Sequence, residues 1–579
     1  MPPLAWHDGP MEIHFLGGAT TVTGSQFLLV TERARVLIDC GMFQGSPNEA
    51  VRNRIPLGFD PTTLDAILLT HAHLDHCGLV PHVVDQGFRG PIIATQGTCE
   101  LAELVLLDSG HLQEEFAKRE ARWERRHPDE AVADDREERA AYDAALRLAE
   151  NPAAAMPIAP DAATIASEAA SEEVAVATET GGEGAWAIAS HGAGRPSPAP
   201  AGAAATAAVD DVEEDLRRQP PVLEVDLDEP LYTQKEARRA IEQFKAIEYD
   251  DEMEVAPGIN ATFVDAGHIL GSAIIRIRVA ERAGEPERTI VFSGDLGRPD
   301  TPIIRDPTIL TDADYILIES TYGGREHEPQ DEAVRVLADT VRLVAESNGV
   351  LLVPSFAIGR TQEVVWQLDR LIDDGAIPRL PLYLDSPMAS KASDIYRRHA
   401  DYFDEETAKL LRAGGSPLDY PDQHVTRRLE ESQAIATAPR PYMIVASNGM
   451  LTGGRVVGHL RNLIGDPDAT ILFVGYQGQG TLGAHLQAGA TEVKIDGQLR
   501  EVRCQIRSIS GFSAHADETE LLDWLSNFAR NKQPGDKGFP RRIFLVHGDP
   551  EAQIAIEPKV KALGFETKIP HWRERAALD

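Results

Sequence analysis

The stretch 66-AILLTHAHLDHCGLVPH-82 places His71, His73, Asp75 and His76 in one turn, directly after an apolar run. Four titratable groups in one turn need partners once they are buried, and a divalent cation supplies such a partner most directly. In an extended turn His71 and His73 point to the same side, so both can bind one ion, while Asp75 and His76 can reach a second. A lone HxH pair is weak evidence, whereas HxHxDH between a strand and a helix indicates a metal site.

The composition bounds the class of protein. At 579 residues the chain is too long for one simple hydrophobic core, so we expect two or more domains. No apolar run approaches the roughly 20 residues that cross a bilayer, which argues against a membrane protein. The N-terminus lacks the pattern of a secretory signal, and four cysteines without paired spacing favour a reducing compartment, the cytoplasm. A net charge of -36 should repel nucleic acid at long range, unless bound cations or local arginines make the electrostatic field positive at the binding site.

Composition also divides the chain into segments. Residues 11–116 show strand-like apolar runs followed by a helix, and similar runs resume over 226–324. Between them, 117–225 is charged and helical in tendency at first, then rich in Ala, Pro, Gly, Ser and acids, so we expect an insertion that is largely disordered in its second half. Residues 325–508 alternate helices and strands, which predicts a parallel sheet with flanking helices. Residues 509–579 add a further helix and strand.

The HxHxDH motif is similar to the signature of the metallo-β-lactamase fold, an αββα sandwich with a two-metal, usually zinc, site at one edge. In that fold the ligands come from successive strand ends. Asp39 in "VLIDCG", His268 in "DAGHILGSA" and Asp295 in "VFSGDLG" match the remaining motifs in order. Each of these residues alone is more simply explained by a turn or a hydrogen-bonded core group, but their order along the chain supports the resemblance.

Three further motifs resemble the β-CASP group, metallo-β-lactamase-fold nucleases that carry an extra α/β domain between motifs A and B. Glu319 in "ILIESTYGG", His515 in "SGFSAHAD" and His547 in "FLVHGD" match motifs A, B and C. Residues 325–508 occupy the place of the extra domain. The resemblance covers nearly the whole chain except 117–225, and is strongest to prokaryotic relatives of the endonuclease subunit of the eukaryotic cleavage and polyadenylation specificity factor. The fold it implies is an α/β metallo-β-lactamase sandwich with an inserted α/β β-CASP domain and a long low-complexity insertion.

The resemblance also implies a metal centre and its chemistry. Two Zn2+ ions, or Mn2+ in their place, would activate a hydroxide and neutralise the phosphate. The implied ligands are His71, His73 and His268 for the first ion, Asp75, His76 and His547 for the second, and Asp295 as the bridge. Asp39 would accept a hydrogen bond from a ligand imidazole. His515, oriented by Glu319, would protonate the leaving group as general acid.

The expected substrate is RNA, because motif C is typically histidine in RNA-processing β-CASP members and valine in DNA-processing ones. Three alternatives stay open: a DNA-processing nuclease, a small-molecule ester or thioester hydrolase, and a non-catalytic scaffold. Expected substrate contacts are Ser355, Arg360, Ser447 and Arg455, which lie in or near matched motifs. Neither of the glycine-rich segments 17-GGATTVTGS-25 and 475-GYQGQGTLG-483 has the GK[ST] ending of a nucleotide-binding loop, so we expect no nucleotide cofactor. The sequence leaves open endonuclease or 5′-exonuclease action, and whether the chain forms a homodimer.

Overall fold

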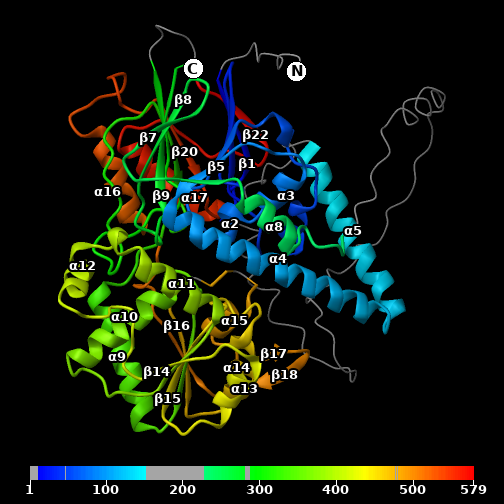
Figure 1. Cartoon of the computed structure of the whole chain (residues 1–579), viewed down its shortest axis with the longest axis vertical. Coiled ribbons are helices and arrows are strands. Elements are labelled where there is room, and N and C mark those ends of the chain that lie inside the picture. The colour runs from blue at the N-terminus through cyan, green and yellow to red at the C-terminus, as the bar shows by residue number, and fades with distance from the viewer. Residues whose placement is uncertain (1–10, 46, 151–226, 281–286, 476, 479) are drawn as a thin grey trace, which may run out of the picture.

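Two seven-stranded sheets pack face to face in the part of the molecule that contains β1 (Glu12–Gly17) and β22 (Glu574–Ala577) (Figure 1). The computed structural model describes residues 11–45, 47–150, 227–280, 287–475, 477–478 and 480–579. The first sheet has the order β22, β1, β2 (Gln26–Val30), β3 (Arg35–Ile38), β4 (Ala66–Leu68), β5 (Ile92–Thr95) and β6 (Phe244–Ile247). The second has the order β21 (Thr567–Lys568), β20 (Arg542–Val546), β11 (Tyr315–Glu319), β10 (Arg288–Phe292), β9 (Ala273–Val279), β8 (Ile259–Asp265) and β7 (Glu252–Ala256).

The alternating direction of side chains along the strands explains why the two sheets pack face to face. On β9, Ala273, Ile275 and Ile277 are buried in the core between the two sheets, whereas Ile274 belongs to a second cluster on the opposite face. Successive strand residues point to opposite faces, so one apolar set joins the sheets and the other packs on helices. The helices on the outer faces are α1 (Pro47–Ala50), α2 (Leu74–Cys77), α3 (Val80–Asp85), α4 (Gln96–Glu124), α5 (Pro128–Glu150), α8 (Gln234–Ile241), α16 (Glu518–Ala529) and α17 (Pro550–Ala562). The result is the predicted αββα sandwich.

A second unit, inserted between β11 and α16, is built on a parallel sheet, as its sequence alternation predicts. Its order is β14 (Gln423–Val425), β13 (Leu382–Asp385), β15 (Tyr442–Ala446), β12 (Val350–Pro354), β16 (Ala469–Phe473) and β19 (Gln505–Ser508), and each neighbouring pair is parallel. Helices α9 (Gln330–Glu346), α10 (Arg360–Asp373), α11 (Pro387–Arg398), α12 (Glu405–Arg412), α13 (Leu429–Ala434), α14 (Arg455–Leu463) and α15 (Leu482–Gln487) accompany it, with a hairpin of β17 (Glu492–Ile495) and β18 (Gln498–Glu501). Apolar clusters line both faces of this sheet.

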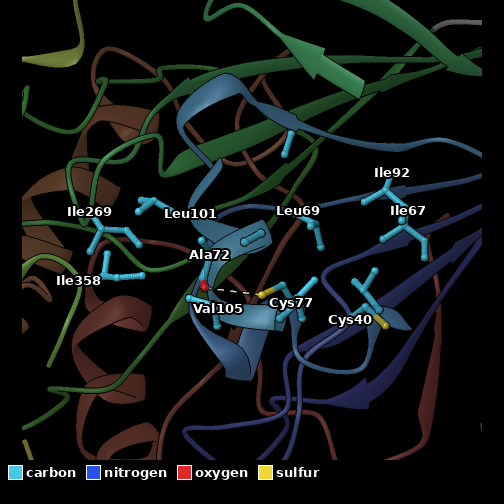
Figure 2. Close-up of a cluster of buried hydrophobic side chains, with 14 of the residues drawn as sticks. Cys40, Ile67, Leu69, Ala72, Cys77, Ile92, Leu101, Val105, Ile269 and Ile358 are labelled. Carbon is cyan, nitrogen blue, oxygen red and sulfur yellow. Dashed lines mark hydrogen bonds between the residues drawn. The ribbon is translucent and has the colours of Figure 1, made fainter. Parts of the chain in front are cut away.

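One hydrophobic cluster joins the sandwich to the inserted unit. It contains Leu101 and Val105 of α4 together with Ile358 and Trp366 from the start of the inserted unit. Figure 2 shows Ile269, which follows a predicted metal ligand, beside Ile358. Burial of this shared surface fixes the inserted unit against the sandwich edge.

The long helix α4 crosses the boundary that composition predicts at 116–117. Its buried positions run from Gly97 to Gly110, and beyond them the helix carries mainly charged side chains as far as Glu124. The change in composition therefore marks where α4 leaves the core and not where the helix ends. The helical tendency predicted after residue 117 appears as the end of α4 and as α5, whereas the disorder expected further along, over 151–225, falls outside the described residues. Within the described ranges, no helix has both the length and the apolar composition needed to cross a membrane.

Candidate metal centre

The side chains predicted as ligands follow strand ends at one edge of the sandwich. Asp39 comes directly after β3, and the HxHxDH turn leads from β4 into α2; these two strands are parallel, so their ends coincide. In the second sheet Asp295 follows β10 and His547 follows β20, with β11 parallel to both. His268 follows β8 in the same sheet. Topology thus brings groups from both sheets to a single edge.

Close backbone approach and strain accompany this convergence. Asp39 and His547 adopt φ of 57° and 47°, a left-handed conformation that costs a non-glycine residue about 1–3 kcal/mol. A Cβ on Gly41 would lie 1.7 Å from the carbonyl oxygen of Asp75, so only glycine permits the loop after β3 to pass the ligand turn. Such strain persists only where the surrounding structure enforces it, as at a functional site.

Four ligand atoms form a first tetrad. His73 Nδ1 lies 3.1 Å from His71 Nε2 and 3.3 Å from His268 Nε2. Asp295 Oδ2 lies 3.4 Å from His71 Nε2 and 3.6 Å from His268 Nε2. A tetrahedral zinc ion with bonds of about 2.0–2.1 Å would separate its ligand atoms by about 3.4 Å. The tetrad therefore has the size of one zinc coordination sphere.

A second group of ligand atoms shares Asp295 with the first. His76 Nε2 lies 3.2 Å from both His547 Nε2 and Asp295 Oδ1, and His547 Nε2 lies 3.6 Å from Asp75 Oδ2. Asp295 Oδ1 is buried and accepts no hydrogen bond. Leaving a buried carboxylate oxygen unpaired is costly, and a cation between these groups would remove that cost. The first group offers three imidazoles and one carboxylate, and the second offers two imidazoles and two carboxylates. Both donor sets fit zinc.

Burial sets the protonation of the first tetrad. It lowers the pKa of His71 to about 3 and of His73 to about 4, and it lowers the pKa of His268 well below its usual value. These imidazoles are therefore neutral at pH 7, with a lone pair available to a metal. Burial acts against ionised Asp295 too, but His547, His76 and His71 hold its pKa well below the usual range.

Two of these imidazoles, those of His71 and His76, have hydrogen-bond partners for their outward-facing nitrogens. His76 Nδ1 donates to Asp39 Oδ2 at 2.8 Å, which is the contact that the sequence predicts for Asp39. Thr70 Oγ1 donates to Asp39 at 2.9 Å and lies 3.1 Å from His71 Nδ1. These bonds fix each ring with its other nitrogen directed at the centre.

Two further hydrogen-bond partners, those of His268 and His547, could not be predicted from the sequence. His268 Nδ1 donates to the backbone oxygen of Ala514 at 3.2 Å, and His547 Nδ1 lies 3.2 Å from Thr321 Oγ1. Thr321 stands two residues after Glu319 in a matched motif, but only the fold reveals its contact across 226 positions. Ala514 contributes a carbonyl group, which carries no sequence signal.

Glu319 and His515 form a hydrogen-bonded pair beside the centre. His515 Nδ1 lies 3.2 Å from both carboxylate oxygens of Glu319 and 4.0 Å from Asp295 Oδ2. Glu319 is fully buried and also accepts a 2.6 Å hydrogen bond from the Leu296 amide. Burial lowers the pKa of His515, but Glu319 opposes this effect and raises the pKa to about 9. His515 therefore carries a proton at neutral pH.

His327 packs behind this pair. Its Nε2 donates to the backbone oxygen of His515 at 3.1 Å, and its ring meets that of Tyr322 edge-on. The sequence offers no motif for this contact, because it joins a loop after β11 to the loop before α16. His327 thus fixes the backbone from which His515 reaches Glu319.

The predicted substrate contacts lie in the inserted unit and are mostly engaged within the chain. Arg360 is buried and paired with Glu363, while Arg455 Nη1 donates to Asp385 at 2.7 Å. Ser355 is buried, and Ser447 Oγ lies 3.1 Å from Ser386 Oγ. A phosphate would have to compete with internal carboxylates for both arginines. Their assignment as phosphate contacts stays a prediction. The ion pairs make it less well supported than before.

Comparisons with known proteins agree with this geometry. The chain matches the metallo-β-lactamase superfamily over residues 19–141, the Beta-Casp domain over 361–486, and the Zn-dependent metallo-hydrolase RNA specificity domain over 500–570. Ribonuclease TTHA0252 of Thermus thermophilus is 31% identical over 564 residues, which cover 97% of this chain and 99% of the relative. Transcription termination factor FttA of Methanosarcina mazei is 27% identical over 565 residues, covering 96% of this chain and 69% of that protein. FttA of Methanothermobacter thermautotrophicus is 25% identical over 574 residues, with coverage of 96% and 70%.

A sandwich of two sheets between helices, with histidines and aspartates converging at one edge, defines a metal-dependent hydrolase of the metallo-β-lactamase fold. The matched domains and the full-length similarity narrow this class further. The chain belongs to the β-CASP family of metal-dependent ribonucleases. The predictions of fold and family are thereby confirmed.

The contact between Asp39 and His76 predicts a measurable loss of metal affinity. In Asp39→Asn the buried carboxylate that fixes the His76 ring loses its charge, so affinity for zinc should fall about 10- to 100-fold. Competition with a chromogenic chelator would measure this. The matched control is Asp60→Asn, because Asp60 is an exposed cap that accepts from the Thr62 amide at 2.9 Å, and asparagine caps equally well. Equal affinity in Asp39→Asn and wild-type protein would contradict the role given to Asp39.

Proposed function

We propose that the chain binds two zinc ions at this edge and hydrolyses phosphodiester bonds of RNA there. His71, His73 and His268 would hold one ion, Asp75, His76 and His547 the other, and Asp295 would contribute one oxygen to each. The observation that carries the proposal is the position of Asp295 between two ligand groups: its Oδ2 lies 3.4 Å from His71 Nε2, and its buried Oδ1, which has no hydrogen-bond partner, lies 3.2 Å from His76 Nε2. Manganese is the alternative ion for the same donor set.

Zinc bound at such a centre supplies Lewis-acid chemistry, which lowers the pKa of water and neutralises phosphoryl oxygens. The chain's own residues would do the rest. Asp39 and Thr70 keep the ligand rings in one tautomer. His515, protonated because of Glu319, would donate its proton to the leaving oxygen, and the pair would then be ready to regain one from solvent.

The relatives support RNA as the substrate and leave the mode of cleavage as a prediction. One relative is named a ribonuclease, and others are named transcription termination factors. The negatively charged chain would depend on its bound cations to attract a polyanion. Endonuclease action, 5′-exonuclease action or both, a homodimer and a cytoplasmic location stay predictions.

Metal analysis combined with three substrates tests the proposal. We expect two zinc ions per purified chain by mass spectrometry, cleavage of single-stranded RNA, and little cleavage of DNA of the same sequence or of a thioester. RNA labelled at each end in turn would separate internal cuts from stepwise shortening. Chelation should abolish cleavage, and added zinc or manganese should restore it. Thioester hydrolysis without RNA cleavage, or a single bound ion at full activity, would refute the proposal.

A further inference from the structure

An exposed aromatic ring stands at the edge of the inserted sheet. Phe356 follows β12 by two residues and is 39% exposed. Among the described residues, the large exposed apolar side chains include one other phenylalanine, Phe116 on α4, which is 57% exposed. A single exposed apolar side chain is ordinary in itself, so its surroundings decide whether it has a role.

The edge that carries Phe356 faces the metal centre. All strands of the inserted sheet are parallel, and after the last of them, β19, the chain runs from Ser508 to His515 beside Glu319. Phe356 also belongs to the loop that contacts the ligand loop of the sandwich. A Cβ on Gly359 would lie 2.8 Å from Ile269, the residue after His268, and Ile358 packs in the same cluster as Ile269 (Figure 2).

The backbone under Phe356 is held rigidly. Its carbonyl oxygen accepts hydrogen bonds from Thr361 Oγ1 at 2.6 Å and from the Thr361 amide at 3.2 Å. The ring rests against Gly449, where a Cβ would come within 3.1 Å of its edge. Gly449 is itself fixed, because its carbonyl oxygen accepts from Gln477 Nε2 at 3.0 Å. The ring therefore has a backbone support on one side and solvent on another.

We propose that the ring of Phe356, supported by Gly449, is a binding site for an unpaired nucleobase of the RNA strand. This inference rests on the proposed function. An aromatic side chain offers a face on which any base stacks, and a rigid one loses little entropy in doing so. A base inside a duplex already stacks on its neighbours, so the site would favour single-stranded RNA without preference for sequence.

Kinetics of four variants test the site in the zinc-loaded full-length protein. Loss of one stacking contact corresponds to about a 5- to 150-fold rise in KM for single-stranded RNA. We expect this rise in Phe356→Ala, with kcat and zinc content unchanged. Phe356→Leu keeps an apolar side chain without the aromatic face and should behave like Phe356→Ala. Phe356→Trp keeps an aromatic face and should have a KM close to that of the wild type. Phe116→Ala is the matched control and should leave KM unchanged.

RNA with an abasic nucleotide at successive positions locates the base. In the wild-type protein, an abasic nucleotide at one position near the cleavage site should raise KM. In Phe356→Ala the same abasic nucleotide should not raise KM further, because the substitution and the missing base remove the same contact. Unchanged KM in Phe356→Ala, or equal abasic effects in both proteins, would overturn the stacking site while RNA cleavage by the wild type stands. Absence of RNA cleavage by the wild type would instead refute the proposed function.

Discussion

Replacing Asp295 with asparagine is expected to abolish binding of at least one zinc ion and to lower RNA cleavage by at least about 10³-fold. The reason is that both carboxylate oxygens face ligand groups: Oδ2 lies 3.4 Å from His71 Nε2, and Oδ1 lies 3.2 Å from His76 Nε2. An amide can offer only one oxygen and no charge. Since metal ions contribute several kcal/mol to hydrolysis and each 1.36 kcal/mol is tenfold in rate, the loss should reach three orders of magnitude.

Zinc content measured beside kcat separates this cause from misfolding. The matched control is Asp369→Asn, because Asp369 is also buried but pairs with Arg370 on α10 of the inserted unit. Circular dichroism should show the same secondary structure in wild type and both variants. Two bound zinc ions with normal cleavage in Asp295→Asn would contradict the shared-ligand geometry, and with it the proposed centre.

Most of the proposed ligands could be identified from the sequence because each lies in a short motif at a strand end. The HxHxDH turn carries four of them, and Asp295 and His547 each follow an apolar run that proves to be a strand. Partners that fix those ligands are harder to predict. Thr321 contacts His547 from 226 positions away, and Ala514 acts through its backbone, so neither shows a local pattern.

The two arginines show what the sequence does not reveal about a predicted contact. A cation near a matched motif suggests a phosphate contact, but the sequence does not reveal which carboxylate already binds it. Arg360 pairs with Glu363, three positions along the same helix, a spacing that could have been anticipated. Arg455, the first residue of α14, pairs with Asp385 at the end of β13, 70 positions earlier, and only the folded chain brings the two together.

His515→Ala is expected to keep both zinc ions and to lower kcat about 10²- to 10⁴-fold, the usual contribution of a general acid. The metal sites should survive because His515 is not among the residues proposed to hold either ion; it forms a third cluster with Asp295 and Glu319, in which its Nδ1 faces Glu319 at 3.2 Å. His424→Ala is the matched control, since His424 is an exposed histidine of the inserted unit, on β14. Loss of zinc in His515→Ala would overturn the acid role, because it would make His515 a ligand.

The pH profile distinguishes an acid from a residue that only supports the fold. His515 must carry a proton to act, so activity is present below its pKa and falls as pH rises through it. Glu319 raises that pKa to about 9. Bound divalent cations nearby would lower it by repulsion, so the fall in activity, the alkaline limb of the profile, should lie at or below about pH 9. Glu319→Gln removes the charge that favours the protonated ring and should move this limb to lower pH, with kcat partly retained on its acidic side. In His515→Ala the limb should disappear. An alkaline limb at the same pH in all three proteins would show that another group titrates and that the Glu319–His515 pair does not supply the proton.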